Sequence, residues 1–462
     1  MKFRNTLLAL IVLGGLVTFI YVYEYKGEPG REEAERAEKS VLNLERDKVE
    51  ELELARTGEE PVVVRKESGA WAMTSPRATR ADEDRVDSLV GTLTSLTIEQ
   101  TMTDVTEQEK AQFGLAPPAV TVTVRSAGKE PATLLVGEKV PMGRGHYAAH
   151  TDGKVLVVSG GLDTVLTTDA TSLRYRKVIG VDTWKVARFS IEAGSEKLAL
   201  ARDGDRWKME APAAFPADST RVQNLWFDIQ GAEAEEFAAE SPGAADLESF
   251  GLARPALTLS VEAREGAAPV RIVFGAPDPN GPVYARRSDL ESVMKIPRAT
   301  FDKLKGALSD VTGFRDARVA PVDRFKLTSL EISRPGQEVV KLLKDEESKW
   351  HWGSSDGPEL PSEQINGVLD ATEALKATGF LDAGPAPQPE PALTLTFTEK
   401  SGDDTLAVSA GLLPEEGKAG APRRFKTSAA PAIYLVSPDL VTTLLGSVDA
   451  IKAPAPAPAA AP

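Results

Sequence analysis

Hydrophobic and polar residues alternate in three pairs of short segments, and each pair is followed by a tryptophan. Alternation with a period of two is typical of half-buried β-strands, and the turn residues between the two segments of each pair predict a hairpin. The pairs are 49–54 with 61–65, 188–192 with 197–201, and 329–333 with 338–342. Trp71, Trp207 and Trp350 follow the charged turn that ends each pair, so we expect each of them in a short third strand.

A second pattern, with helical spacing, follows each tryptophan. Apolar residues recur at i, i+3, i+4 and i+7, which places them on one face of a helix. The three sets are Val86, Leu89, Val90 and Leu93; Val222, Leu225, Trp226 and Ile229; and Ile365, Val368, Leu369 and Thr372. Asp82, Asp218 and Ser362 precede these stripes, and we expect them to cap the helices. Arg85 and Arg221 stand three residues after the two aspartates, a spacing that predicts surface ion pairs.

The rest of each unit predicts a meander of short strands that ends in a helix. In the first unit we expect strands at 118–124, 133–136, 146–150 and 155–159 and a helix at 161–168. Phe-Gly-Leu precedes the first two meanders, at 113–115 and 250–252, and predicts a helix that ends at a left-handed glycine. Equivalent positions in the three meanders are occupied by Gly137, Gly275 and Gly411 and by Tyr147, Tyr284 and Phe425.

Pro-Ala pairs at 118, 255 and 391 give the period of the repeat, because the prolines lie 137 and 136 residues apart. A unit of this length can close its own core, so the sequence predicts tandem domains and not a solenoid. We expect each unit to be α+β, a mainly antiparallel sheet with flanking helices. The predicted units are 49–177, 181–319 and 324–452, and residues 453–462 predict a disordered Pro/Ala-rich tail.

The start of the chain predicts a membrane anchor. Residues 6–23 carry no charge and are long enough, as one transmembrane helix, to cross a bilayer. Cations precede this segment within residues 1–5 and glutamates follow it, so the positive-inside rule places 1–5 in the cytoplasm and the bulk of the chain outside. The alternative is a cleaved signal peptide, but bulky residues stand where a small-residue cleavage site is expected. Residues 24–48 are highly charged and predict a solvated stalk.

Composition narrows the classes of function. The 462 residues include no cysteine, so disulfides, thiolate catalysis and a lipid anchor on cysteine are excluded. The chain has 69 acidic and 54 basic residues and a net charge of −15, which disfavours a nucleic-acid partner.

The sequence offers few candidates for catalysis or metal binding. His146 and His150 would face each other on a helix, but strand signals place them on an extended segment and too far apart to share a metal. His351 has no obvious nucleophile partner. The acidic clusters at 82–84, 235–236 and 345–347 fall at helix starts, turns or solvated faces, and the glycine-rich segments 143–145 and 159–161 predict turns. We therefore expect no catalytic, cofactor-binding or metal residues.

The repeated motifs together resemble a known family. An N-terminal apolar segment, a Gly-x-Trp-x-Met step, an Ala-Asp-x-x-Arg-Val helix start at 81–86 and 217–222, and Phe-Gly-Leu before Pro-Ala are similar to domain-of-unknown-function family 4340. The resemblance extends from residue 1 to about 452, and the third unit departs from it most. It implies a bacterial membrane-anchored extracytoplasmic protein, often encoded beside components of gliding-type ABC transporters. The family supplies no catalytic residues to carry over.

The sequence therefore favours a non-enzymatic, single-pass protein of the cytoplasmic membrane whose extracytoplasmic units form an interaction scaffold. We expect it to be an accessory subunit of an ABC-type export or gliding-like complex. An alternative is a module that binds cell-envelope glycan or another ligand, with Trp184 or Trp352 as a stacking surface. An envelope hydrolase is a third hypothesis, because acidic pairs can assemble from distant segments.

Overall fold

The structure is a computed structural model that describes residues 38–453, except for 142, 144, 265–267, 278–280, 385–386, 402–403 and 417–419. The expected transmembrane helix at 6–23 lies outside the described residues, as do 1–5, 24–37 and most of the expected tail. Over the part of the chain that is described, no helix is long and apolar enough to cross a membrane. The chain divides after Arg176 into two compact units.

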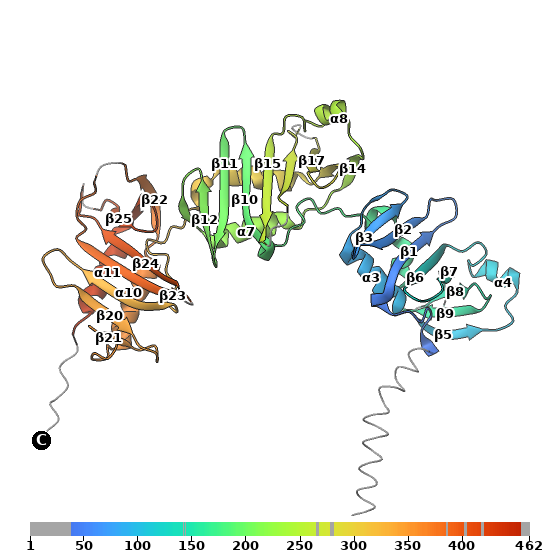
Figure 1. Ribbon diagram of the computed structural model, residues 1–462, viewed down its shortest axis with the longest axis horizontal. Helices are drawn as coiled ribbons and strands as arrows, with labels where there is room; N and C mark the ends of the chain where they lie inside the picture. Colours follow the sequence, from blue (N-terminus) through green and yellow to red (C-terminus); the bar gives the residue numbers. More distant parts are fainter. Residues whose placement is uncertain are drawn as a thin grey trace, which may run out of the picture. The chain divides into compact units, whose positions relative to one another are not determined.

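The first unit is built on one antiparallel sheet of nine strands, in the order β4-β3-β2-β1-β6-β7-β8-β9-β5 (Figure 1). The strands are β1 (Val49–Ala55), β2 (Val62–Glu67), β3 (Ala70–Ser75), β4 (Thr79–Arg80), β5 (Thr97–Met102), β6 (Val120–Ser126), β7 (Ala132–Lys139), β8 (His146–His150) and β9 (Val155–Ser159). The helices are α3 (Glu83–Thr94), α4 (Glu107–Gln112), α5 (Leu162–Thr167) and α6 (Ala170–Leu173). A short 3₁₀ turn, η2 (Arg46–Lys48), leads into β1.

The second unit contains two further sheets of the same pattern. The first has nine strands in the order β13-β12-β11-β10-β15-β16-β17-β18-β14, and the second has eight in the order β21-β20-β19-β23-β24-β25-β26-β22. We call the three sheets with their helices repeats 1, 2 and 3. The strands of repeat 2 are β10 (Val186–Ala193), β11 (Glu196–Asp203), β12 (Arg206–Ala211), β13 (Phe215–Ala217), β14 (Glu236–Ala239), β15 (Leu257–Ala263), β16 (Val270–Phe274), β17 (Val283–Arg287) and β18 (Val293–Ile296). Those of repeat 3 are β19 (Leu327–Ser333), β20 (Val340–Lys344), β21 (Trp350–Trp352), β22 (Ala377–Asp382), β23 (Leu393–Ser401), β24 (Asp404–Leu412), β25 (Arg423–Thr427) and β26 (Ala432–Val436).

The long helices of the second unit cover one face of each sheet and contribute buried residues to its core. They are α7 (Ser219–Gln230) and α9 (Arg298–Ser309) in repeat 2, and α10 (Ser362–Ala374) and α11 (Pro438–Ala450) in repeat 3. The short helix α8 (Ala244–Ser249) has no buried residue and leads into the Phe-Gly-Leu loop of repeat 2. Two short 3₁₀ turns are η3 (Thr183–Lys185) and η5 (Val311–Phe314). The predicted α+β class with three mainly antiparallel sheets is confirmed. The three hairpins, the tryptophan strands and the amphipathic helices also form where the sequence predicts them, and the predicted stripe residues are buried.

Two of the three predicted helix caps are confirmed. The carboxylate of Asp82 accepts the backbone N–H of Arg85, and that of Asp218 accepts the N–H of Arg221. The prediction for Ser362 is wrong, because this residue is the first of α10 and Pro361 occupies the cap position without a side-chain bond.

The predicted surface ion pairs form only in part. Asp82 and Arg85 approach to 3.9 Å, but the Asp82 side chain is buried. Arg221 forms its ion pair with Asp310.

The strand that closes the far edge of each sheet was not predicted. β5, β14 and β22 follow the amphipathic helix and pair with the last meander strand, so the helix crosses the sheet from one edge to the other. In β5 no residue is fully buried, and its Thr, Glu and Gln side chains do not alternate with apolar ones. An edge strand of this kind lacks the pattern that identifies a half-buried strand.

Residues from 38 onward already belong to the fold of repeat 1. Val41 and Leu42, within the segment expected to be a stalk, are buried in the core of the first unit. Ser40 forms an antiparallel bridge to Thr97 at the start of β5. Repeat 1 therefore begins before its first strand.

Candidate functional site

The Phe-Gly-Leu loops cover the face of the sheet opposite the helices. The Phe113 ring stacks on Tyr147 at 4.2 Å between centroids, and Phe250 lies 4.6 Å from Tyr284. Gly114 has φ +69°, in the left-handed region that the sequence predicts, and Gly251 has φ +70°. The loop in repeat 1 pairs with the meander, since the N–H of Glu138 donates to the carbonyl of Phe113 at 2.8 Å.

Gly137 and Gly275 are required by the close approach of these loops. A β-carbon at Gly137 would lie 2.2 Å from the Phe113 carbonyl oxygen, and one at Gly275 would lie 2.2 Å from that of Phe250. Such contacts are sterically forbidden, so any side chain here would displace the loop. Both glycines therefore serve the fold and not a ligand.

Repeat 3 lacks this loop, and its predicted equivalences are wrong. The register of β23 with β24 places Leu413 at the position of Gly137, and the register of β25 with β26 places Arg424 at the position of Tyr147. The sequence pattern predicts Gly411 and Phe425 at these two positions. Phe425 is buried on the helix-covered side of the sheet, and without a Phe-Gly-Leu loop no aromatic partner is needed on the other side.

The segment that joins repeats 2 and 3 is bound to both of them. Arg315 pairs with Ala217 of repeat 2, and Arg318 pairs with Lys376 of repeat 3. The N–H of Val319 donates to the Leu375 carbonyl at 3.1 Å. The joining segment thus forms one isolated antiparallel β-bridge to each repeat.

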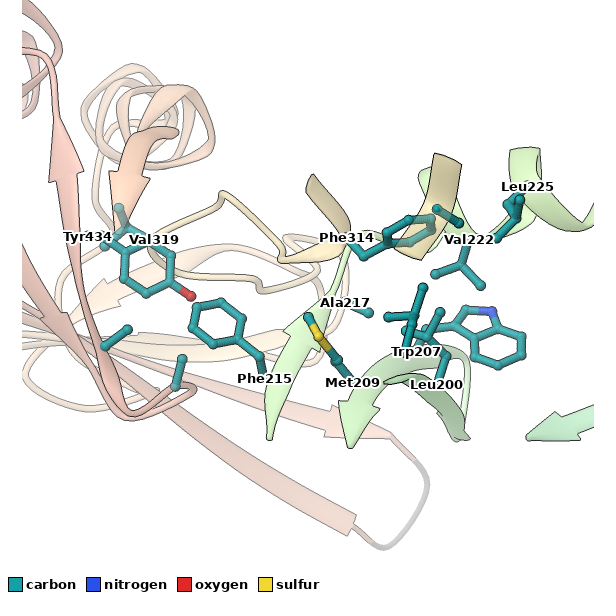
Figure 2. Packing of buried hydrophobic residues seen from close by; sticks show 14 of the residues in the cluster. Leu200, Trp207, Met209, Phe215, Ala217, Val222, Leu225, Phe314, Val319 and Tyr434 are labelled. Atoms are coloured by element: carbon teal, nitrogen blue, oxygen red, sulfur yellow. The ribbon is translucent and has the colours of Figure 1, made fainter. Parts of the chain in front are cut away.

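Aromatic rings from repeats 2 and 3 meet beside this segment (Figure 2). The ring centroid of Phe215 in β13 lies 5.3 Å from that of Phe380 in β22 and 5.8 Å from that of Tyr434 in β26. The centroids of Phe380 and Tyr434 lie 5.0 Å apart. The guanidinium of Arg315 lies over both phenylalanine rings, at 4.9 and 5.5 Å. Phe215 and Tyr434 are buried, and a single hydrophobic cluster includes residues of both repeats.

Tyr434 is a polar residue in this apolar contact. Its hydroxyl is buried and no hydrogen-bond partner is found for it within the described residues. Burial is the main cause that raises the pKa of Tyr434, and the negative charge of Asp316 adds to it. The hydroxyl is therefore un-ionised in the folded protein.

A polar contact forms at the same junction. Glu399 is buried, accepts a hydrogen bond from Arg206 of repeat 2 at 2.5 Å, and also accepts the backbone N–H of Asp323. Lys326 reaches Asp205 at 3.2 Å. Asp205, Arg206, Asp323 and Lys326 border an open groove of about 450 Å³ to which both repeats contribute.

The histidines considered as candidates occupy separate sites. His146 and His150 lie at the two ends of β8, as predicted, and the structure does not bring them together. His146 is buried 3.4 Å from Asp163, and burial lowers its pKa more than the aspartate raises it. Over the described ranges, no group of three or more His, Asp or Glu residues could hold a metal ion.

His351 is held in the hairpin of repeat 3. One ring nitrogen lies 2.8 Å from the Gly357 carbonyl oxygen, and the other lies 2.7 Å from an oxygen of Asp345. Both neighbours are acceptors, which favours the doubly protonated ring. The Gly357 carbonyl, followed by Asp345, raises the pKa of His351.

The acidic clusters and glycine-rich segments considered as candidates form caps, ion pairs and turns of the fold. Asp82 caps α3, Glu235 and Glu236 lie 3.7 and 4.0 Å from Lys295, and Asp345 accepts from His351. Gly160 and Gly161 have positive φ and form the turn into α5. Arg144 lies outside the described residues.

The two tryptophans expected as stacking surfaces differ in exposure. Trp184 is 64% exposed in η3. Trp352 is partly buried and packs against the hydrophobic cluster of the second unit, so the expectation of an exposed ring is wrong. Phe325, a further exposed ring that was not predicted, is 86% exposed and occupies the place of Trp184 in repeat 3. The signal was present in the repeat, because Asp-x-aromatic-Lys occurs at 182–185 and at 323–326.

The comparison with known families agrees with the resemblance seen in the sequence. The model of the family described as "Domain of unknown function (DUF4340)" matches residues 71–209 and 207–395, two overlapping regions that begin at Trp71 and Trp207. No curated protein matches the chain. The chain therefore belongs to the DUF4340 family.

Proposed function

We propose that this protein is a non-enzymatic scaffold, anchored in the cytoplasmic membrane by residues 6–23, whose repeats bind a protein partner on the extracytoplasmic side. The observation that carries the proposal is that the residues that build the fold recur between the repeats, whereas polar residues on the sheets differ. The tryptophans and stripe residues recur in all three repeats, and the loop glycines in repeats 1 and 2, because they build the fold. By contrast, the position of Glu51, a polar site in the first strand of repeat 1, is occupied by Arg188 in repeat 2 and Ser329 in repeat 3.

A repeated fold with different surfaces suits a binding arm better than an enzyme. Each repeat leaves one face of its sheet without a large helix, and this face carries the varying charged residues. Differences between such surfaces determine which partner is bound, since like charges in contact exclude the wrong one. The partner that we propose is an ABC-type export or gliding-like complex, in which this chain is an accessory subunit.

The test is purification of the full chain from membranes in mild detergent, followed by identification of co-purifying proteins. We expect transporter subunits in stoichiometric amounts. A matched variant should replace residues 6–23 with a different apolar helix of the same length, because the partner should persist if the repeats bind it. Repeated recovery of the protein without any transporter subunit would reject this partner.

A glycan-binding module is a second candidate, favoured by the exposed rings of Trp184 and Phe325. They occupy equivalent positions in repeats 2 and 3, immediately before the first strand. Exposed aromatic faces can stack on sugar rings, which have apolar C–H faces. Cell-envelope glycan should retain the parent protein in a pull-down and should not retain the double variant W184A/F325A. The control is F227A, since Phe227 is 74% exposed on α7 and has no counterpart of this kind. Equal retention of all three proteins would exclude these rings as the platform.

A further inference from the structure

A buried glutamate joins two arginines on the outer face of repeat 1. Glu51 in β1 is only 7% exposed. Its carboxylate accepts from Arg65 of β2 at 2.6 Å and from Arg125 of β6 at 2.8 Å, and the ion pair with Arg65 closes to 2.5 Å. Both partners come from the cross-strand register, in which Glu51 lies opposite Arg65 on one side and Arg125 on the other.

The two guanidinium groups are held in place but remain accessible. The side chains of Arg65 and Arg125 are 56% and 53% exposed, whereas the carboxylate between them is nearly covered. Arg65 binds Glu51 through Nε and Nη2, and Arg125 binds it through Nε. The other N–H groups of the two side chains take no part in these bonds. Planar guanidinium groups fixed in this way are prepared to bind an oxyanion, because less side-chain freedom is lost.

The fold does not need this arrangement. The same three positions hold Arg188, Ala201 and Glu262 in repeat 2, and Ser329, Leu343 and Thr398 in repeat 3. Both repeats form the same sheet without two arginines around a buried carboxylate. A purely structural role therefore explains the cluster poorly.

The arginines face an open groove of about 570 Å³ at the end of the sheet where β1 begins. Its charged lining consists of four cations and three anions: Lys48, Arg65, Lys66, Arg125, Asp47, Glu50 and Glu51. The groove therefore carries a net charge of +1 on a chain of net charge −15. A ligand with one negative charge would neutralise the groove, whereas a dianion would leave it with a net charge of −1 beside Asp47 and Glu50.

We propose that this groove binds a carboxylate group of a ligand through the outward N–H groups of Arg65 and Arg125. Guanidinium and carboxylate form paired, charge-assisted hydrogen bonds. Glu51 is a positioning residue, since both of its oxygens are already used by the arginines. The site does not depend on the membrane anchor or on the partner proposed above.

The test uses the full chain in detergent with ¹⁵N-labelled arginine, observed through the Nε–H resonances of Arg65 and Arg125, which R65K and R125K identify. The probe is N-acetylglycine, with N-acetylglycinamide as the neutral control and inorganic phosphate as the competing oxyanion. We expect a saturable shift of both resonances with N-acetylglycine, weaker binding of phosphate, and no shift with the amide.

Variants separate this site from general charge effects. R65Q and R125Q should each weaken N-acetylglycine binding by about tenfold or more. R188Q removes one arginine charge from β10, at the position that Glu51 has in β1, and should leave binding unchanged. The circular dichroism melting curve of each variant shows whether it folds; if R125Q does not, R65Q alone carries the test. Absence of saturation, or equal affinity in R65Q and R188Q, would overturn the site. Tighter binding of phosphate than of N-acetylglycine would overturn its assignment to carboxylate.

Discussion

Removal of the Phe215 ring should weaken the junction between repeats 2 and 3. The ring is 5% exposed and its neighbours Phe380 and Tyr434 belong to the other repeat. Substitution of a buried phenylalanine by alanine costs about 3–5 kcal/mol of the free energy of unfolding. Each aromatic pair contributes about 0.5–1.5 kcal/mol beyond the buried area, so about 1–3 kcal/mol of the loss is interaction between the repeats.

A double-mutant cycle measures this interaction directly. F215A, Y434A and the double variant are compared with the parent chain by urea unfolding, all without the first 37 residues. The two rings are 5.8 Å apart, so we expect the double variant to lose about 1 kcal/mol less stability than the sum of the single losses. Hydrogen exchange adds a local readout, because F215A in β13 should accelerate exchange in β22 and β26 of the other repeat.

A control cycle combines Y434A with F301A. Phe301 is buried under the sheet of repeat 2, where its nearest aromatic ring is Phe274 at 6.5 Å. These two losses should add to within about 0.5 kcal/mol. If the Phe215 cycle is equally additive and exchange in β22 and β26 does not change, the rings do not couple the repeats and the reasoning is refuted.

Three further predictions concern single residues. G275A should destabilise repeat 2 by about 1–3 kcal/mol in urea unfolding, because the added β-carbon would meet the Phe250 carbonyl. The control G306A places its β-carbon in open space on α9 and should stabilise the protein by about 0.5–1 kcal/mol. Equal effects of the two substitutions would contradict the steric argument. R287L should cost about 3–5 kcal/mol, since Arg287 is 2% exposed, forms an ion pair and donates to three consecutive backbone carbonyls, and a loss below 1 kcal/mol would contradict this role. The raised pKa of His351 means that its protonation stabilises repeat 3 fully below about pH 6.5 and that this contribution is lost as the pH rises through the folded pKa. H351Q should flatten the dependence of stability on pH above 6.5, and an unchanged pH profile would show that the imidazolium contributes nothing.

The sequence predicted the elements whose pattern is set by local burial. The stripe of Val222, Leu225, Trp226 and Ile229 is buried as expected, because an amphipathic helix on a sheet exposes one face and covers the other. The Asp82 and Asp218 caps also follow from local chemistry, since the bond spans only three residues. The triplicate pattern strengthened each prediction, as an accidental match would not recur at the same spacing.

Elements that depend on distant partners could not be predicted in this way. β5 pairs with β9 across a long stretch of chain, and its own residues carry no alternating pattern. The incorrect assignment of Gly411 to the position of Gly137 has a similar cause. Gly411 matched Gly137 in residue type, but the register of a sheet is set by which strands pair and not by one glycine.

The Glu51 cluster was equally hidden in the sequence. Arg65 and Arg125 stand 14 and 74 residues from Glu51, and only the order β2-β1-β6 brings all three together. No local spacing rule connects them. Sites formed across a sheet become visible only once its strand order and register are known.

The aromatic junction shows how repeats of one fold can acquire different connections. Strand registers place Thr79 of repeat 1 at the position of Phe215, and Met294 of repeat 2 at the position of Tyr434. A threonine and a methionine cannot form the ring contacts that join repeats 2 and 3. The joining contact is therefore a property of a few substituted positions and not of the fold itself, just as the charges around Glu51 distinguish repeat 1 from the others. Because the strand order and registers are kept at these substituted positions, each repeat can change its neighbour or its ligand while it keeps the same sheet.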